Sequence, residues 1–216
     1  MRHRDEHKQQ ALLEATLHEV AEHGFAVTSV ARIARAAGMS PGTLYLYYRD
    51  KDDLLEATFR EVSRRIIAVA IEAFQAEPAE AFEAEPAEAF EAEPSPLSPA
   101  AQQLKSALCR VWNALVALGR RQPALFLFHD QFLHSSHMQD ALRVANQERA
   151  APLLDAFALG QQSGILKQID LALIEVFMFR SIYSLLQGSS CQLPAISDAS
   201  FDQAFEMAWD AIALRQ

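Results

Sequence analysis

The chain has 216 residues, half of them hydrophobic, and its formal net charge is −9. It holds no apolar run of about eighteen residues, no charged segment followed by an apolar leader, and no metal or redox spacing around its two cysteines, Cys109 and Cys191. These features exclude a membrane-spanning protein and a cysteine-based metal motif, and they favour a cytoplasmic globular protein without a membrane partner.

Two helices are predicted before residue 40. Apolar residues at helical spacing predict the first over residues 8–23, and Gly24 supplies its stop. Thr28 and Ser29 carry hydroxyls of the kind that cap helices, so the second helix is expected to begin beside them. Gly38 is expected to end it.

Two more helices are predicted before residue 76. Ser40 can cap a very short third helix with Pro41 at its first position, where a missing N–H costs little. Asp50 can cap a fourth helix that continues to about residue 74. The second and third helices are separated by a short turn. They therefore predict a helix-turn-helix, a motif whose second helix enters the major groove of DNA.

The third helix and its surroundings have side chains that fit DNA. Pro41 and Gly42 allow the backbone to approach closely, and Thr43 offers a hydroxyl and a methyl to base edges. The nearby tyrosines can donate hydrogen bonds to phosphates while their rings pack on the scaffold, and Lys51 adds a positive charge. Double-stranded DNA is therefore the expected partner.

The stretch TSVARIARAAGMSPGTLYLYYRDKDDLL, residues 28–55, resembles the DNA-binding signature of TetR-type transcriptional regulators. The likeness is strong over residues 8–60, and the remainder matches in length and helix pattern. The resemblance implies an all-α fold of nine or so helices. It also implies a homodimer that binds a palindromic DNA operator as a repressor and is released by a small-molecule effector.

The resemblance also implies roles for individual residues. Leu44 and Tyr48 match core positions. Val30 and Ala31 replace the polar base reader that the family often carries early in the second helix, so base reading is expected from the third helix. Packing within the chain stays the alternative for each tyrosine. The residues expected to contact DNA are Thr28, Ser29, Ser40, Pro41, Gly42, Thr43, Tyr45, Tyr47 and Lys51.

An acidic repeat follows the fourth helix. Residues 76–91 read AEPAEAFE twice, and a third AEP begins at Ala92. Its prolines forbid a continuous helix, so an insert at about residues 76–97 is expected, partly disordered or in short broken turns; a partner-binding segment is the alternative. Residues 76–95 hold seven glutamates and no base, and removing these charges from the total leaves −2. The overall acidity therefore does not argue against DNA as a partner.

Five helices are expected beyond the insert, over residues 98–120, 123–135, 138–163, 169–188 and 198–214. No alternating strand pattern competes with them, so the predicted fold class is all-α. The predicted division is a DNA-binding domain over residues 1–50 and a ligand-binding and dimerisation domain over residues 51–216. The last two helices are the expected dimer seam.

The C-terminal helices are rich in aromatic residues, which are expected to serve as core, as dimer interface or as the lining of a ligand pocket. Arg180 needs a partner in so apolar a helix. Glu175 or Asp155 of the same chain, an acid across the dimer and a ligand carboxylate are all candidates. The residues expected to line the pocket are Trp112, Phe128, His129, Phe132, Phe179, Arg180 and Tyr183.

Catalytic and metal motifs are weak throughout the sequence. His18 and His23 lie five residues apart, whereas a zinc-protease helix needs a spacing of four. His129, His134 and His137 fit no single helical face, so polar helix ends are expected in place of a metal site. No enzyme, cofactor or metal is expected. The alternatives to a DNA-binding regulator are a helical ligand-binding protein or enzyme with a vestigial DNA-binding unit, and an interaction module centred on the repeat.

Overall fold

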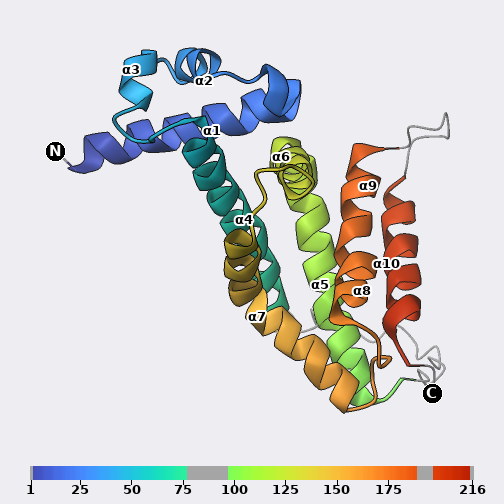
Figure 1. Cartoon of the computed structure of the whole chain (residues 1–216). Coiled ribbons are helices and arrows are strands. Elements are labelled where there is room, and N and C mark those ends of the chain that lie inside the picture. The colour runs from blue at the N-terminus through green and yellow to red at the C-terminus, as the bar shows by residue number, and fades with distance from the viewer. Residues whose placement is uncertain (1, 77–96, 189–196, 215–216) are drawn as a thin grey trace. The chain divides into compact units, whose positions relative to one another are not determined.

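The computed structural model describes residues 2–76, 97–188 and 197–214, with side chains from residue 6 onward (Figure 1). Within these ranges the regular structure is helical, apart from an isolated bridge between Leu166 and Ala213. The all-α prediction is confirmed. The glutamate-rich repeat beyond residue 76 and Cys191 fall outside the described residues, so what was expected of the repeat stays a prediction.

Apart from the start of the first helix, the helices begin and end close to the predicted residues. In chain order they are α1 (Arg2–Val27), α2 (Val30–Ala36), α3 (Pro41–Leu44), α4 (Lys51–Gln75), α5 (Pro99–Arg121), α6 (Pro123–Leu133), α7 (Asp140–Gln162), α8 (Leu171–Glu175), the π-helical segment η1 (Val176–Arg180), α9 (Ser181–Gln187) and α10 (Asp198–Ile212). Because α8, η1 and α9 follow one another without a break, the described residues form nine helical rods. None of these rods is both long and apolar enough to cross a bilayer.

The chain forms two compact units. Unit one comprises Met1–Ile67 and Ala117–Arg149, and unit two comprises Ala68–Val116 and Ala150–Gln216. Helices α4, α5 and α7 each contribute residues to both units. The whole helix-turn-helix lies in unit one, together with α6.

Helix α1 is interrupted at Gly24, whose φ of 75° and ψ of 169° are not helical. Glycine adopts positive φ at little cost, so the regular helix ends where the sequence predicts a stop, and a short helical segment continues to Val27. At its other end α1 begins at Arg2, well before the predicted start at residue 8. The residues there are mostly charged or polar helix formers, which extend a helix without adding an apolar period.

An ion-pair network joins α1 to α4 within unit one. Arg65 on α4 donates hydrogen bonds to Glu14 on α1 and to Glu61 on its own helix. Hydrogen bonds from Arg64 and then from Arg65 lower the pKa of Glu61 from 4.5 to about 2, against the opposing effect of burial. A carboxyl whose pKa is lowered by folding stabilises the folded state at pH values above the pKa that it has in the unfolded chain. This contribution is therefore present above about pH 4.5 and lost as the pH falls toward about 2.

An aromatic cluster fills unit one where α6 meets α1 and α4. Phe132 stacks on Phe59 with ring centroids 4.3 Å apart and 13° between the ring planes, and His129 stacks on Phe59 at 5.3 Å. Phe25, just after the kink in α1, has its ring 6.0 Å from that of Phe132 and 6.1 Å from that of Phe128. The cluster therefore ties α6 to the helices that carry the helix-turn-helix.

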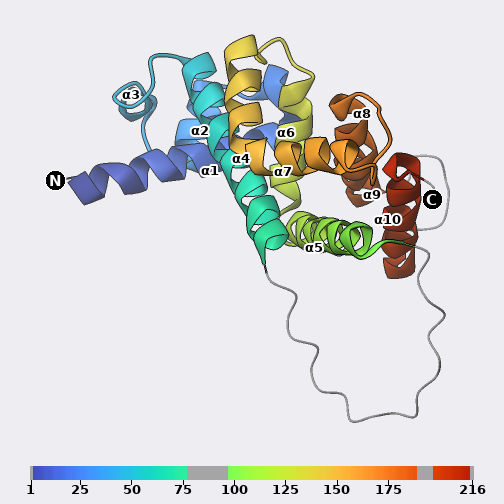
Figure 2. The same ribbon diagram turned by 90° about the horizontal axis from the view of Figure 1, so that it is seen from below.

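Unit two is built on contacts among α5, α7, η1 and α10. The Trp112 ring of α5 meets the Phe205 ring of α10 edge-on at 5.8 Å, and the Phe157 ring of α7 lies 6.1 Å from that of Phe179 in η1. Figure 1 shows the rod of α8 and α9 beside α10, and Figure 2 shows the same helices from below. The residues of η1, which joins α8 to α9, are in contact with α10. The predicted helix over 169–188 is thus one rod with a π-helical turn at its centre, a feature that its apolar periodicity does not reveal.

Candidate nucleic-acid interface

Two capped helices form the helix-turn-helix. At the start of α2 the exposed Ser29 hydroxyl accepts a hydrogen bond from the backbone N–H of Arg32 at 3.3 Å. At the start of α3 the exposed Ser40 hydroxyl accepts one from the backbone N–H of Thr43, also at 3.3 Å. Gly38 turns the chain between them with a φ of 68°. Both predicted caps are present, and each hydroxyl also lies at a helix N-terminus, where backbone N–H groups favour phosphate.

The inner face of this motif is a small core shared by α1, α2, α3 and α4. It confirms the core roles predicted for Leu44 and Tyr48, which are both buried. Burial raises the pKa of the Tyr48 phenol. The buried members of this core are Leu12, Ala15, Ile33, Leu44, Tyr48 and Leu54.

The outer face of α3 is open. Ser40, Pro41 and Gly42 are exposed, whereas Thr43 is only partly so, and the Thr43 hydroxyl lies 3.0 Å from that of Ser40. A Cβ built on Gly42 would meet nothing nearer than the Ser40 hydroxyl oxygen at 3.8 Å. Gly42 has no positive φ, so neither local space nor backbone conformation explains a glycine in this helix.

The three tyrosines after Thr43 have different surroundings. Tyr45 is 57% exposed, and Tyr48 is 5% exposed. Tyr47 is partly buried and packs against the core that contains Tyr48. The ring of Tyr45 is therefore open to contact from outside the chain. Tyr47 combines packing with partial exposure, as a side chain needs if it is to donate a hydrogen bond to a phosphate while its ring is held in place.

Lys51 links α4 to the end of α1. Its ammonium donates a hydrogen bond to the backbone carbonyl of Phe25 at 2.7 Å. An ammonium has three donors, so this bond leaves capacity for a phosphate. Lys51 thus has a structural function that its position after Asp50 does not reveal, because Phe25 is far away in the sequence.

We expect Lys51→Ala to lower both the stability of the protein and its affinity for DNA. Stability should fall by about 1 kcal/mol, because the hydrogen bond to Phe25 is removed. Affinity should fall for all sequences alike, and the slope of log affinity against log salt should flatten by ~0.9 for each phosphate that is no longer neutralised. Thermal melts and salt titrations measure the two effects. A variant with altered base preference and an unchanged salt slope would contradict the phosphate contact.

The structure corrects the expectation for Thr28. Its side chain is buried, and its hydroxyl lies 2.8 Å from the carbonyl oxygen of Gly24 and 3.2 Å from that of Glu19. The Gly24 carbonyl also accepts a hydrogen bond from the backbone N–H of Thr28 at 3.3 Å, so both donors of Thr28 are directed at the end of α1. This hydroxyl is therefore turned into the protein and is not available to a phosphate.

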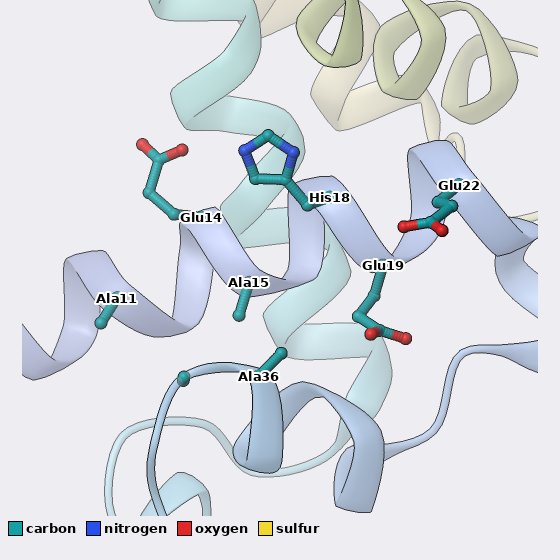
Figure 3. Close-up of a pocket in the computed structure, with 8 residues that line it drawn as sticks. Ala11, Glu14, Ala15, His18, Glu19, Glu22 and Ala36 are labelled. Atoms are coloured by element: carbon teal, nitrogen blue, oxygen red, sulfur yellow. The ribbon is translucent and has the colours of Figure 1, made fainter.

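The other side of the motif is acidic. A hollow of about 380 Å³ lies between α1 and α2, and Figure 3 shows carboxylates of α1 around it. Glu19 pairs with Arg32 at 2.7 Å, so the charge of that arginine is neutralised within the chain. Phosphate would be repelled from this side. The hollow is lined by Ala11, Glu14, Ala15, His18, Glu19, Glu22, Ala36 and Ala37.

Two family models match the chain. "Bacterial regulatory proteins, tetR family" matches residues 12–58, which include α2, α3 and the start of α4. "Tetracyclin repressor-like, C-terminal domain" matches residues 103–213, more than half of the chain. The chain belongs to the TetR family. Membership places it among bacterial regulators of transcription that bind DNA, as the resemblance of residues 28–55 implies.

Solved structures and curated relatives agree with this family. A TetR family transcription regulator from Marinobacter aquaeolei VT8 is 41% identical, with a TM-score of 0.82 and full coverage of both chains. A putative TetR family regulator from Shewanella sp. PV-4 is 20% identical over 96% of this chain and 99% of its own, with a TM-score of 0.71, which supports the fold alone. The regulator BetI of Escherichia coli is 30% identical over 119 residues. The match covers 55% of this chain and only 58% of the length of BetI.

The residues expected to line a pocket in this TetR-family chain fall into the two units. Phe128, His129 and Phe132 belong to unit one, where their rings pack with Phe25 and Phe59. That these three residues line a ligand pocket stays a prediction. Their packing against α1 and α4 could not be predicted, because the periodicity of α6 shows which face is apolar but not which helices cover it.

The remaining candidates lie in unit two. Trp112 is fully buried, and its indole Nε1 has no hydrogen-bond acceptor among the described residues. The Arg180 guanidinium lies over the ring of Tyr183, 5.1 Å from its centroid, which is a cation–π contact. Phe179 precedes Arg180 in η1 and lies beside Phe157. That these residues line a ligand pocket in unit two stays a proposal.

Of the three histidines near the end of α6, His134 is the polar helix end that the sequence predicts, because it is the exposed C-cap residue of α6, whereas His129 and His137 pack on aromatic rings. His129 stacks on Phe59, and the His137 ring lies 5.3 Å from Phe25 while its Nδ1 is 3.4 Å from a carboxylate oxygen of Asp52. His134 has its Nδ1 2.8 Å from the backbone oxygen of Asp130. The described residues contain no group of three or more His, Cys, Asp or Glu side chains that could hold a metal ion.

Proposed function

We propose that this TetR-family chain acts in the cytoplasm as a homodimeric repressor that binds a palindromic operator and is released by a small-molecule effector. The observation that carries the DNA contact is the open tip of α3 at Gly42, where a Cβ would meet nothing nearer than the Ser40 hydroxyl at 3.8 Å. Glycine inside a helix lowers stability by roughly 0.5–1 kcal/mol relative to alanine. A glycine that the fold does not need is explained by close approach of a molecule outside the chain, here the major groove of DNA.

Exposed apolar residues support the homodimer. Leu173, Val176 and Phe177 follow one another at helical spacing on α8 and η1 and are all about half exposed, and Met207 of the adjacent α10 is more exposed still. These four residues, called the apolar face below, occur on the two rods that the sequence favours as a dimer seam. A two-fold dimer would present two α3 helices to half-sites one DNA turn apart, about 34–36 Å.

The effector is proposed to bind in unit two, in contact with Trp112 and η1. A buried N–H without an acceptor costs free energy, and an acceptor atom of a bound molecule would remove that cost. A π-helical turn such as η1 is a local departure from regular helix that often accompanies function. Release follows if the effector binds better to a state that cannot seat both α3 helices on the operator.

The proposal is tested by selecting bound sites from random duplex DNA with the purified full chain. Repeated selection should converge on an inverted repeat, and affinity for it should fall steeply with rising salt, because binding releases counterions from the phosphates. A helical ligand-binding protein with a vestigial DNA-binding unit would enrich no sequence. Titration of candidate small molecules into the selected complex then tests release.

Gly42→Ala should separate folding from DNA binding. The variant should melt at a slightly higher temperature, because alanine stabilises a helix by roughly 0.5–1 kcal/mol relative to glycine. Its affinity for the selected duplex should fall, since the added methyl would stand between α3 and the groove. Gly160→Ala cannot serve as a control for the effect of alanine on helix stability, because a Cβ at residue 160 would lie 2.9 Å from the side chain of Leu166. An unchanged affinity in Gly42→Ala would mean that DNA does not approach this tip.

A further inference from the structure

Leu46 is the most exposed large hydrophobic side chain among the described residues, at 81%. It lies two residues after the end of α3, between the exposed Tyr45 and the partly buried Tyr47. A leucine so exposed forgoes the favourable transfer of its side chain out of water. Its place beside the recognition helix suggests that a partner covers it.

The backbone holds Leu46 in a fixed direction. Its N–H donates to the carbonyl of Thr43 at 3.2 Å, and the next two N–H groups, of Tyr47 and Tyr48, both donate to the carbonyl of Leu44 at 2.9 and 3.1 Å. These bonds continue the helical turn past the last residue of α3. Leu46 is therefore presented by a hydrogen-bonded turn and not by a free loop.

The spacing of Leu46 from Gly42 and Leu44 places it on the outer side of this turn. In a helix, residues four apart share a face, and residues two apart are nearly opposite. Leu46 is four residues after Gly42 and two after the fully buried Leu44. The contrast between the exposed Leu46 and the buried Leu44 agrees with this placement, close to the tip where DNA is proposed to approach.

We infer that Leu46 reads a thymine by apolar contact with its C5-methyl group in the major groove. The inference rests on the proposed DNA contact of α3. A leucine has no donor or acceptor for a phosphate or for a polar base edge, whereas the thymine methyl is the apolar group that bases present in this groove. Leu46 thus supplies base discrimination that the chain lacks at Val30 and Ala31, where α2 has no polar side chain.

The contact is tested with the duplex that the full-length protein selects from random DNA. Each thymine is replaced in turn by deoxyuridine, which removes only the methyl group, and affinity is measured for the wild type and for Leu46→Ala. At one thymine of each half-site, the replacement should weaken the wild type about fourfold, the factor that corresponds to one buried carbon at about 0.8 kcal/mol. The same replacement should leave Leu46→Ala unaffected.

Val144→Ala is the matched control, because Val144 is an exposed apolar residue of α7 outside the helix-turn-helix. It should respond to deoxyuridine as the wild type does, and both variants should have the melting temperature of the wild type. A selected site without thymine, or a methyl effect of equal size in Leu46→Ala, overturns the inference while leaving DNA binding intact. A wild-type chain that selects no duplex overturns the proposed function and this inference together.

Discussion

Replacing Tyr48 with alanine is expected to lower the free energy of unfolding by roughly 3–5 kcal/mol, because the change removes a large ring and leaves a cavity in a small core. Tyr48 is 5% exposed and packs with Leu44 and Leu54 between α3 and α4. DNA binding should fail in this variant because the motif unfolds. Binding should recover at high concentrations of the selected duplex, since a ligand that binds only the folded state stabilises it.

Tyr45→Ala is the matched control, three residues away in the same sequence context. Tyr45 is 57% exposed, so its removal should change stability by no more than about 0.5 kcal/mol. Its effect should appear as weaker binding to all DNA sequences, because the phenol no longer donates to a phosphate. Chemical denaturation and DNA titration of both variants give the comparison. A Tyr48 variant that folds normally yet cannot bind would mean that the faces of this turn are reversed.

Local sequence signals predict the helix-turn-helix well. Its caps, its Gly38 turn and its buried Leu44 each depend on residues within a few positions of one another, and the structure has all three. The packing function of Tyr48, as distinct from Tyr45, is implied by the resemblance to the TetR pattern, and the burial of Tyr48 confirms it.

Residues whose function depends on a distant partner are predicted less well. Lys51 donates a hydrogen bond to the carbonyl of Phe25, and the Thr28 hydroxyl donates one to the carbonyl of Gly24, at the kink of α1. Neither partner follows from helical periodicity. The same holds for Phe132, whose aromatic character predicts burial but cannot tell a ligand pocket from the Phe59 ring on which it stacks. Local pattern determines which face of a helix is apolar, and tertiary structure determines what covers that face.

Leu46 is easily overlooked in the sequence for a related reason. It is an ordinary apolar residue in a stretch dominated by tyrosines, and apolar residues are usually assigned to the core. The signal that identifies it is its register, two residues from the buried Leu44 and four from Gly42. A single exposed leucine is ordinary on a protein surface, so its exposure alone identifies nothing. Leu46 becomes informative through its place beside the proposed recognition helix.

Phe177→Asp is expected to convert the proposed dimer into monomers. Phe177 is 47% exposed in the apolar face, where a second copy would cover it. In a two-fold interface one substitution changes both subunits and places two carboxylates in an apolar surface. With at least about 2 kcal/mol for each buried aromatic anchor, the dimer dissociation constant should rise by about a thousandfold. Sedimentation velocity across a concentration series measures this shift directly.

The same variant should lose operator binding although its helix-turn-helix is unchanged. A monomer holds one half-site and about half of the phosphate contacts, so both the affinity and the salt slope should fall together. Leu159→Asp is the matched control, since Leu159 is 64% exposed on α7 and lies outside the apolar face. It should stay dimeric and bind as the wild type does. If Phe177→Asp sediments as a dimer and keeps the full salt slope, the second copy does not bind at α8 and η1, and the apolar face must meet some other partner.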